Sequence, residues 1–229
     1  MNKFSTSGSI PSPKERMTKA ALIYKYAHTS ATSLLAAFDD AKTKRGNVRG
    51  VLTDQEQDIL RAALVMACAG LDGSLKQGIR DCLEHLLTTE SAVRDGFEKF
   101  IRKRIGGEND ILETGGGAKF LARILSDSSP RKRLIEDYIR ELTGESLQST
   151  EEVMRTTAAL GINYKELNLD IERLKEVFKL RNKIIHELDI NLEAPKRKRK
   201  VRSQTDLLDS ADFTLSVTRT ILRALNRKA

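Results

Sequence analysis

The sequence has no tryptophan, only 5% aromatic residues, and no apolar run near the roughly 20 residues of a membrane-spanning helix. It also lacks the sustained alternation of apolar and polar positions that is typical of strands. These absences argue against a strand-based fold and against a membrane-spanning helix. Because Met1–Pro13 contains no apolar stretch of signal-peptide length, we expect a soluble, cytoplasmic protein with no membrane partner.

Cysteine is scarce as well. Cys68 and Cys82 both lie in apolar patterns with helical spacing, so we expect small buried thiols in a reducing compartment rather than a disulfide. No group of cysteine, histidine and carboxylate residues has metal-ligand spacing. The sequence therefore calls for no metal and no cofactor.

The positive charge is confined to one place. A chain of 229 residues can bury a substantial core in one large domain, and its net charge of +8 would suit nucleic acid or acidic lipid if it were spread out. Six of these charges lie in the run Lys196–Arg202, which leaves +2 for the other 222 residues. The excess charge is therefore a property of one short segment.

Helical periodicity recurs throughout the chain and predicts an all-α fold. We expect residues 1–16, which are rich in serine and proline, to be disordered, and residues 17–229 to form one helical domain. Short links favour antiparallel neighbours in an up-and-down bundle. The expected helices are Ala21–Phe38, 54–87, Ala92–Ile105, Lys119–Ser126, Pro130–Thr143, Thr150–Leu160, Leu169–Leu188 and a last helix from Thr205 or Asp206.

The helix that follows Thr53 has the clearest signals. Thr53 and Glu56 form a capping box at its start. Its buried face is predicted to contain Leu60, Leu64, Ala67, Leu71 and Leu75. The small residues beside that face are Cys68, Gly70, Gly73, Ser74 and Gly78. We interpret them as room for a closely packed neighbouring helix; a kinked or broken helix is the alternative. Separately, Leu22, Tyr26 and Leu34 recur at near-helical spacing in the expected helix Ala21–Phe38.

The middle of the chain contains two groups of glycines between predicted helices, Gly106–Gly107 and Gly115–Gly117. The triplet is followed by Ala118 and Lys119, but the Gly-Lys-Ser/Thr ending of a phosphate-binding loop is missing. We therefore interpret it as a flexible link between helices.

The candidate catalytic residues lie on the predicted helix Leu169–Leu188. Its apolar residues Ile171, Leu174, Phe178, Ile185 and Leu188 follow a heptad-like seam. Arg181 falls in the same seam, and a charged side chain is costly to desolvate without a partner. We expect Arg181 to face a polar cleft or an interface; a structural ion pair is the alternative.

His186 differs from His28 and His85, which we interpret as ordinary helix-face residues, because of its neighbours. Asn182 precedes His186 by four residues and shares its helix face, so the amide can orient the imidazole. Arg181 and His186 are separated by about 140° around an ideal helix and about 7.5 Å along it, which is poor spacing for a compact pair. This geometry favours a homodimer in which two copies complete a composite cleft.

The string Leu-Arg-Asn-Lys-Ile-Ile-His-Glu at Leu180–Glu187 resembles the Arg-x-x-x-x-His motif of the HEPN superfamily (higher eukaryotes and prokaryotes nucleotide-binding). Residues Ile59–Asp72 are similar to the early long helix of its RiboL-PSP-type group. The resemblance covers about Asp54 to Leu225. Residues 106–147 fit the pattern less well and are interpreted as an insertion, and the N-terminal helix has no place in it.

The resemblance implies a homodimeric, metal-independent endoribonuclease of bacterial toxin, phage-defence or RNA-processing type. His186 would act as general base or acid in the attack of a ribose 2'-hydroxyl on the adjacent phosphate, oriented by Asn182. Arg181 would stabilise the phosphorane charge. Such an enzyme also implies restraint by an antitoxin or another regulatory partner.

The basic segment, residues 195–204, is predicted to be a loop that contacts phosphates near the scissile bond. The RNA-binding candidates are Lys183, Lys196, Arg197, Lys198, Arg199, Lys200 and Arg202. A nuclear-localisation signal and a merely solvated loop are the alternatives. Asp72 and Glu187 would add polarity to the cleft if they are not simply solvent-facing.

Two rival functions remain at this point. One is a catalytically idle HEPN module that binds RNA or nucleotide, or dimerises within a larger assembly. The other is a helical scaffold or DNA-binding protein that acts through its basic loop. Cleavage of RNA in the presence of EDTA distinguishes the ribonuclease from both.

Overall fold

The protein is described here by a computed structural model that covers residues 3–46, 51–106, 116–147, 149–193, 195 and 197–229. The helices are α1 Thr18–Lys44, α2 Asp54–Thr89, α3 Ser91–Gly106, α4 Gly116–Leu125, α5 Pro130–Thr143, α6 Thr150–Ala159, α7 Ile171–Glu187 and α8 Gln204–Lys228. Two short 3-10 helices, Glu15–Met17 and Tyr164–Leu167, precede α1 and α7. In these ranges the only β-type pairing is a single antiparallel bridge between Ile190 and Arg199. The all-α prediction is confirmed.

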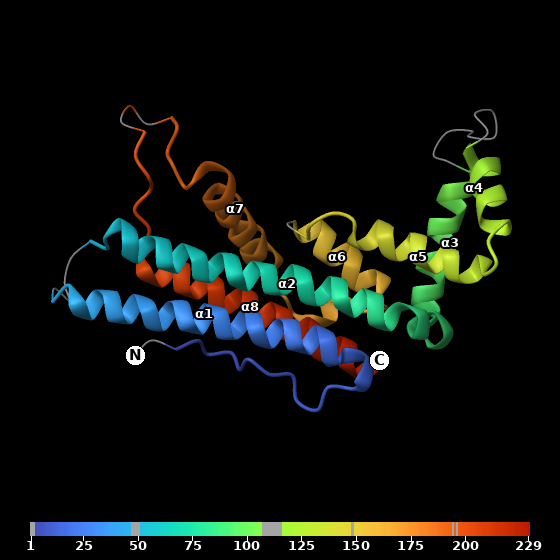
Figure 1. Cartoon of the computed structure of the whole chain (residues 1–229), viewed down its shortest axis with the longest axis horizontal. Helices are drawn as coiled ribbons and strands as arrows, with labels where there is room; N and C mark the ends of the chain where they lie inside the picture. Colours follow the sequence, from blue (N-terminus) through green and yellow to red (C-terminus); the bar gives the residue numbers. More distant parts are fainter. Residues whose placement is uncertain (1–2, 47–50, 107–115, 148, 194, 196) are drawn as a thin grey trace.

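The long helices α1, α2 and α8 lie side by side and form the body of the molecule (Figure 1). The predicted capping box opens α2, because the Thr53 hydroxyl accepts a hydrogen bond from the Glu56 amide and the Glu56 carboxylate accepts one from the Thr53 amide. The predicted stripe is buried along its whole length: Leu60, Leu64, Ala67, Leu71 and Leu75 are at most 1% exposed. Cys68 and Cys82 are free, buried thiols as expected.

The small residues of α2 let its neighbours approach closely, and α2 runs unbroken from Asp54 to Thr89. A Cβ atom added at Gly70 would lie 2.4 Å from the Cβ of Ala27 on α1. One added at Gly78 would lie 2.7 Å from a methyl group of Leu225 on α8. The interpretation of this surface as a close helix contact is confirmed, and a kinked helix is excluded.

The same contact decides which face of α1 points inward. Ala27 lies against Gly70, and this rotation buries Tyr24, Leu35 and Phe38. Leu22 and Tyr26, which the sequence pattern assigned to the apolar face, are 49% and 63% exposed. The pattern failed here because alanine and glycine, not large apolar residues, make the contact.

The N-terminal segment follows a defined path along α1 and α8 (Figure 1). The Thr6 amide donates to the Asp212 carboxylate, and the Lys14 amide donates to the Asn226 side chain, so two side chains of α8 hold its backbone. Tyr24 donates its hydroxyl hydrogen to the carbonyl of Ser7, and Ile10 is only 5% exposed. This differs from the disorder expected from composition, because the partners lie on helices that are distant in the sequence.

Helices α3, α4 and α5 form a lobe at one end of the body (Figure 1). The predicted bounds Pro130–Thr143 match α5, with the proline in its first turn. Gly116 and Gly117 belong to the first turn of α4, so the expected flexible link is wrong for these two residues. A Cβ atom at Gly117 would lie 2.2 Å from the carbonyl oxygen of Ile105, which explains the glycine by close backbone approach. Gly107 and Gly115 lie outside the described residues.

Over the described part of the chain, no helix combines the length and apolar character required to cross a membrane.

Candidate functional site

Helix α7 presents the predicted motif residues on its last two turns. The Asp170 carboxylate caps its start by accepting a hydrogen bond from the Arg173 amide. Its end is abrupt, because Leu188 and Asp189 both adopt left-handed backbone conformations, with φ of 50° and 57°. The reversal sends the chain away from the helix directly after the motif (Figure 1).

The buried face of α7 contains Leu174, Val177, Phe178 and Ile184. Leu174 and Phe178 were predicted in the seam, but Ile185 and Leu188 are 38% and 61% exposed, so their assignment to it is wrong. Ile185 lies one residue, about 100°, beyond the buried Ile184. Leu188 leaves the helical path through its left-handed conformation.

Arg181 is half-buried on the side of α7 that faces the core. Its Nη1 donates a hydrogen bond of 2.9 Å to Oδ1 of Asn182. Burial raises the pKa of the Cys68 thiol on α2 to about 12, and the Arg181 charge opposes this effect, as does a hydrogen bond with Thr214. Arg181 is therefore close enough to α2 for its charge to act on a buried thiol of that helix.

Asn182 is half-buried and His186 is exposed. Both are in the described part of the chain, and no hydrogen bond joins them; the Asn182 oxygen accepts from Arg181 instead. The expected orientation of the imidazole by Asn182 is therefore not seen in a single chain. The motif offers a paired Arg181–Asn182 unit and, one turn later, an imidazole open to solvent.

A buried ion pair that the sequence reasoning missed holds the end of α7 onto α2. Arg61 is 3% exposed, and its Nη2 lies 3.2 Å from Oδ2 of Asp189, whose side chain is fully buried. Arg202 adds two hydrogen bonds to the same carboxylate, of 2.7 and 3.0 Å. Arg61 also donates to the carbonyl of Lys200, at 2.7 Å. We refer to Arg61, Asp189 and Arg202 as the arginine clamp.

Next to the clamp, residues 189–191 pair with residues 198–200, and we refer to these two paired stretches as the pinned hairpin. The Lys200 amide donates to the Asp189 carbonyl, and the Asn191 amide donates to the Lys198 carbonyl. Arg199 pairs with Asp58 on α2 at 2.6 Å and donates to the carbonyl of Leu188. The interpretation as a merely solvated loop is therefore wrong for this hairpin.

The carboxylates of Asp58 and Asp189 are stabilised in their charged form. The hydrogen bond from Arg199 lowers the pKa of Asp58, and Arg61 adds to the effect. Burial by itself would raise the pKa of Asp189, but hydrogen bonds and charge from Arg202 and Arg61 outweigh it and lower that pKa. At neutral pH the clamp therefore contains a carboxylate between two guanidinium groups.

The predicted RNA-binding residues divide into two groups. Lys183, Arg197 and Lys198 are exposed. Arg199 and Arg202 are half-buried in ion pairs, and Lys200 is half-buried with its backbone in the hairpin. Lys196 lies outside the described residues.

The two acidic candidates have different positions. Asp72 accepts a hydrogen bond from the Leu147 amide at 2.7 Å and pairs with Lys76 at 2.9 Å, so it holds the segment before α6 against α2. Glu187 is exposed next to His186. Among the described residues, no three His, Cys, Asp or Glu side chains gather as metal ligands would.

A signal for the clamp does exist in the sequence. Arg61 stands inside the apolar pattern of α2, next to Leu60, and a buried arginine requires a carboxylate partner. The partner, Asp189, is 128 residues further along the chain. Nothing in the local pattern singles it out.

The chain thus forms an all-α domain built on the long helix α2, with Arg181 half-buried and His186 exposed on α7. A family model described as RiboL-PSP-HEPN matches residues 26–226, and the chain belongs to this family. The match starts within α1, so most of that helix lies inside the family range, although the sequence analysis had given it no place there. HEPN domains are often ribonucleases, and membership indicates a nuclease or an RNA-binding module. Comparisons with curated proteins and with solved structures gave no match.

Proposed function

We propose that the protein is a metal-independent endoribonuclease of toxin or phage-defence type. The observation that carries the proposal is the position of Arg181 and His186 at the open end of α7 in a HEPN domain. His186 is exposed to solvent, and imidazole is the side chain that most often transfers protons in general acid-base catalysis. An RNA strand can therefore reach the imidazole.

The reaction is an internal transesterification. His186 removes the proton from a ribose 2'-hydroxyl, whose oxygen attacks the adjacent phosphorus while the bond to the 5'-oxygen breaks. Arg181 stabilises the negative charge that accumulates on the phosphoryl oxygens through its planar donors. The products are a 2',3'-cyclic phosphate and a 5'-hydroxyl end, and DNA is spared because it lacks the nucleophile.

A homodimer supplies the remaining geometry. His186 is exposed, whereas Arg181 is half-buried beside Asn182, so one chain does not present the two groups as an open pair. Ile185, Leu188 and Leu192, close to His186 in the sequence, expose apolar side chains. Covering these side chains with a second copy would bury apolar surface and bring each imidazole to the partner's Arg181.

Exposed cations extend the site along the RNA backbone. Lys183, Arg197 and Lys198 are available for phosphate contacts, and Lys196 belongs to the same run. Arg199, Lys200 and Arg202 are better suited to hold the hairpin, because ion pairs or backbone contacts already engage them. A toxin-like enzyme also needs a neutralising antitoxin or regulatory partner, and we include one in the proposal.

Cleavage of RNA tests the proposal directly. We expect the purified protein to cut single-stranded RNA in EDTA and to leave 2',3'-cyclic phosphate ends, identified by mass spectrometry. Arg181→Ala and His186→Ala should each lower the rate by at least about 100-fold, as expected for the loss of a transition-state donor or a general base. Lys179→Ala, an exposed residue on the same helix, is the matched control and should retain cleavage.

One observation favours a second candidate, a non-catalytic module that binds RNA or nucleotide. Arg181 hydrogen-bonds to Asn182, and Asn182 is not bonded to His186. If wild-type protein binds RNA but never cleaves it at any pH or salt concentration tested, this second function is correct and the ribonuclease is ruled out.

A further inference from the structure

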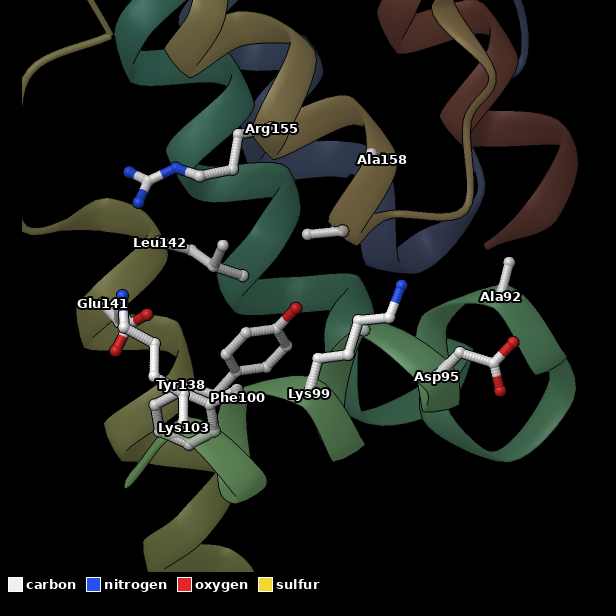
Figure 2. A pocket seen from close by; sticks show the side chains of 12 residues that line it. Ala92, Asp95, Lys99, Phe100, Lys103, Tyr138, Glu141, Leu142, Arg155 and Ala158 are labelled. Carbon is white, nitrogen blue, oxygen red and sulfur yellow. The ribbon is translucent and has the colours of Figure 1, made fainter. Parts of the chain in front are cut away.

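A second site lies between helices α3, α5 and α6, and the motif on α7 does not contribute to it. It is a cavity of about 580 Å³, a size typical of small-molecule sites. None of its lining residues comes from α7 or from the basic hairpin. Figure 2 shows the side chains that surround it.

The floor of the cavity is aromatic. The ring centroids of Phe100 and Tyr138 lie 4.9 Å apart, and both residues are buried, at 3% and 5% exposure. Phe97 supports them from α3, with its centroid 5.4 Å from that of Tyr138. These contacts fix the rings in place, so a flat ligand would meet a surface that is already formed.

Tyr138 provides an unused hydrogen-bond donor at this floor. Within the described residues its hydroxyl has no hydrogen-bond partner, and Figure 2 shows it pointing into the space between Lys99 and Ala158. Burial raises the pKa of Tyr138 to about 12 and the charge of Glu141 adds to this, while Arg155 opposes it. The hydroxyl therefore keeps its proton at neutral pH. The hydroxyl is therefore available to donate a hydrogen bond to an acceptor on a ligand in the cavity.

The rim of the cavity is positively charged. Lys99 and Lys103 from α3 and Arg155 from α6 line it, and none of them forms an ion pair with another described residue. Of the two carboxylates in the lining, Glu141 is engaged by Arg104 at 2.8 Å. The other, Asp95, turns away from Tyr138 in Figure 2. The cations therefore outnumber the carboxylates that are available to neutralise them.

Small residues create the room above the rings. Gly96 and the alanines Ala92, Ala158 and Ala159 line the cavity. A Cβ atom at Gly96 would lie 3.2 Å from the Tyr138 hydroxyl oxygen. Larger side chains at these positions would fill the space that the rings and the hydroxyl face.

We propose that this cavity binds a small ligand consisting of a flat aromatic ring and one anionic group, a class that includes nucleoside monophosphates and aromatic carboxylates. The ring lies between the small residues, against the parts of Phe100 and Tyr138 that line the cavity. An acceptor on the ligand takes the Tyr138 hydroxyl hydrogen, and the anionic group lies among Lys99, Lys103 and Arg155. Because the site is separate from α7, this inference does not depend on ribonuclease activity.

Titration calorimetry of the full chain tests the proposal with four probes: adenosine 5'-monophosphate, adenosine, inorganic phosphate and indole-3-acetate. We expect at least one of the two aromatic anions to bind more tightly than both adenosine and phosphate, with affinity that falls as salt rises. The phosphate and carboxylate arms distinguish the two sources of the anionic group. If neither aromatic anion binds at millimolar concentration, or if adenosine or phosphate binds as tightly, the proposal is overturned.

Variants locate the binding in the cavity. Tyr138→Phe should weaken binding about 3- to 10-fold, the effect of one lost hydrogen bond between neutral groups, and Ala158→Leu should abolish it by filling the space. Ala158 is exposed in the free protein, so this variant should unfold at the same urea concentration as the wild type. Lys25→Gln, an exposed change on α1, is the control for charge and should leave binding unchanged. Unaltered binding in folded Ala158→Leu protein would place the ligand elsewhere and contradict the proposal.

Discussion

Asp189 shows how the environment of one side chain sets both its charge and its structural importance. Its carboxylate is fully buried, and it accepts hydrogen bonds from Arg61 and Arg202. It lies three residues after His186, in the reversal that ends α7. The clamp therefore fixes the position at which the imidazole-bearing turn stops.

Replacing Asp189 by alanine should destabilise the protein severely. Breaking a buried ion pair by removing one member costs about 3–5 kcal/mol, and Arg61 would keep only the half-exposed carboxylate of Asp58, at 3.2 Å, as an ionic partner. The free energy of unfolding, measured by urea titration, should fall by that amount. The control is Asp58→Ala, whose carboxylate is 50% exposed and whose loss should cost about 1 kcal/mol or less. Equal losses in the two variants would contradict the clamp.

The same carboxylate predicts a dependence of stability on pH. The arginines lower the pKa of Asp189 in the folded state despite burial, whereas in the unfolded chain it is about 3.9. The stabilisation is therefore complete above the unfolded value and is lost as pH falls through the lowered folded value. The difference in unfolding free energy between wild type and Asp189→Asn should be constant near neutral pH and should shrink as pH falls below about 4. A constant difference over that range would show that Asp189 titrates normally.

At the scale of elements, the contact between α1 and α2 depends on residues with almost no side chain. Gly70 faces Ala27, where an added Cβ would overlap at 2.4 Å. The glycine lowers the helix propensity of α2, but it allows α1 to lie close and to bury Tyr24 and Phe38. Packing between two helices outweighs the local preference of one.

The substitution Gly70→Ala separates these two effects. Helix propensity favours alanine by about 1 kcal/mol, while overpacking of a tight contact costs about 1–3 kcal/mol. Because the neighbouring Cβ of Ala27 cannot rotate away, we expect a net loss of stability in thermal unfolding. A second change, Ala27→Gly, should recover part of the loss. An increase in stability for Gly70→Ala alone would contradict the close contact.

At the scale of the whole molecule, the proposed active site belongs to two chains. Each chain contributes an exposed His186 at the end of α7 and a half-buried Arg181. The apolar side chains of Ile185, Leu188 and Leu192, which lie within six residues of His186 in the sequence, are also exposed. The cavity beside Tyr138, by contrast, is complete within one chain.

Mixing two inactive variants tests the composite site. A heterodimer of Arg181→Ala and His186→Ala contains one site with both residues intact, if each site takes its arginine from one copy and its histidine from the other. Co-refolding equal amounts should restore about a quarter of wild-type cleavage, since about half of the dimers are mixed and each has one working site. Each variant refolded alone is the control. Absence of recovery, with dimers verified by light scattering, would place both residues of a site in the same chain.

Much of the local structure could be predicted because its determinants are close together in the sequence. The Thr53–Glu56 capping box and Pro130 indicated where α2 and α5 begin, and the apolar stripe of α2 is buried as expected. The string from Arg181 to His186 indicated the HEPN superfamily, to which the chain belongs. These signals act within one or two helical turns.

Only the tertiary structure decided what depends on distant partners. The pairing of Arg61 with Asp189 spans 128 residues, and it converts a predicted loop into a pinned hairpin. The N-terminal segment is ordered by Asp212 and Asn226, near the other end of the chain. The inward faces of α1 and α7 likewise follow from the helices they contact. Periodicity shows that a helix has an apolar face, but its partner determines which residues are finally covered.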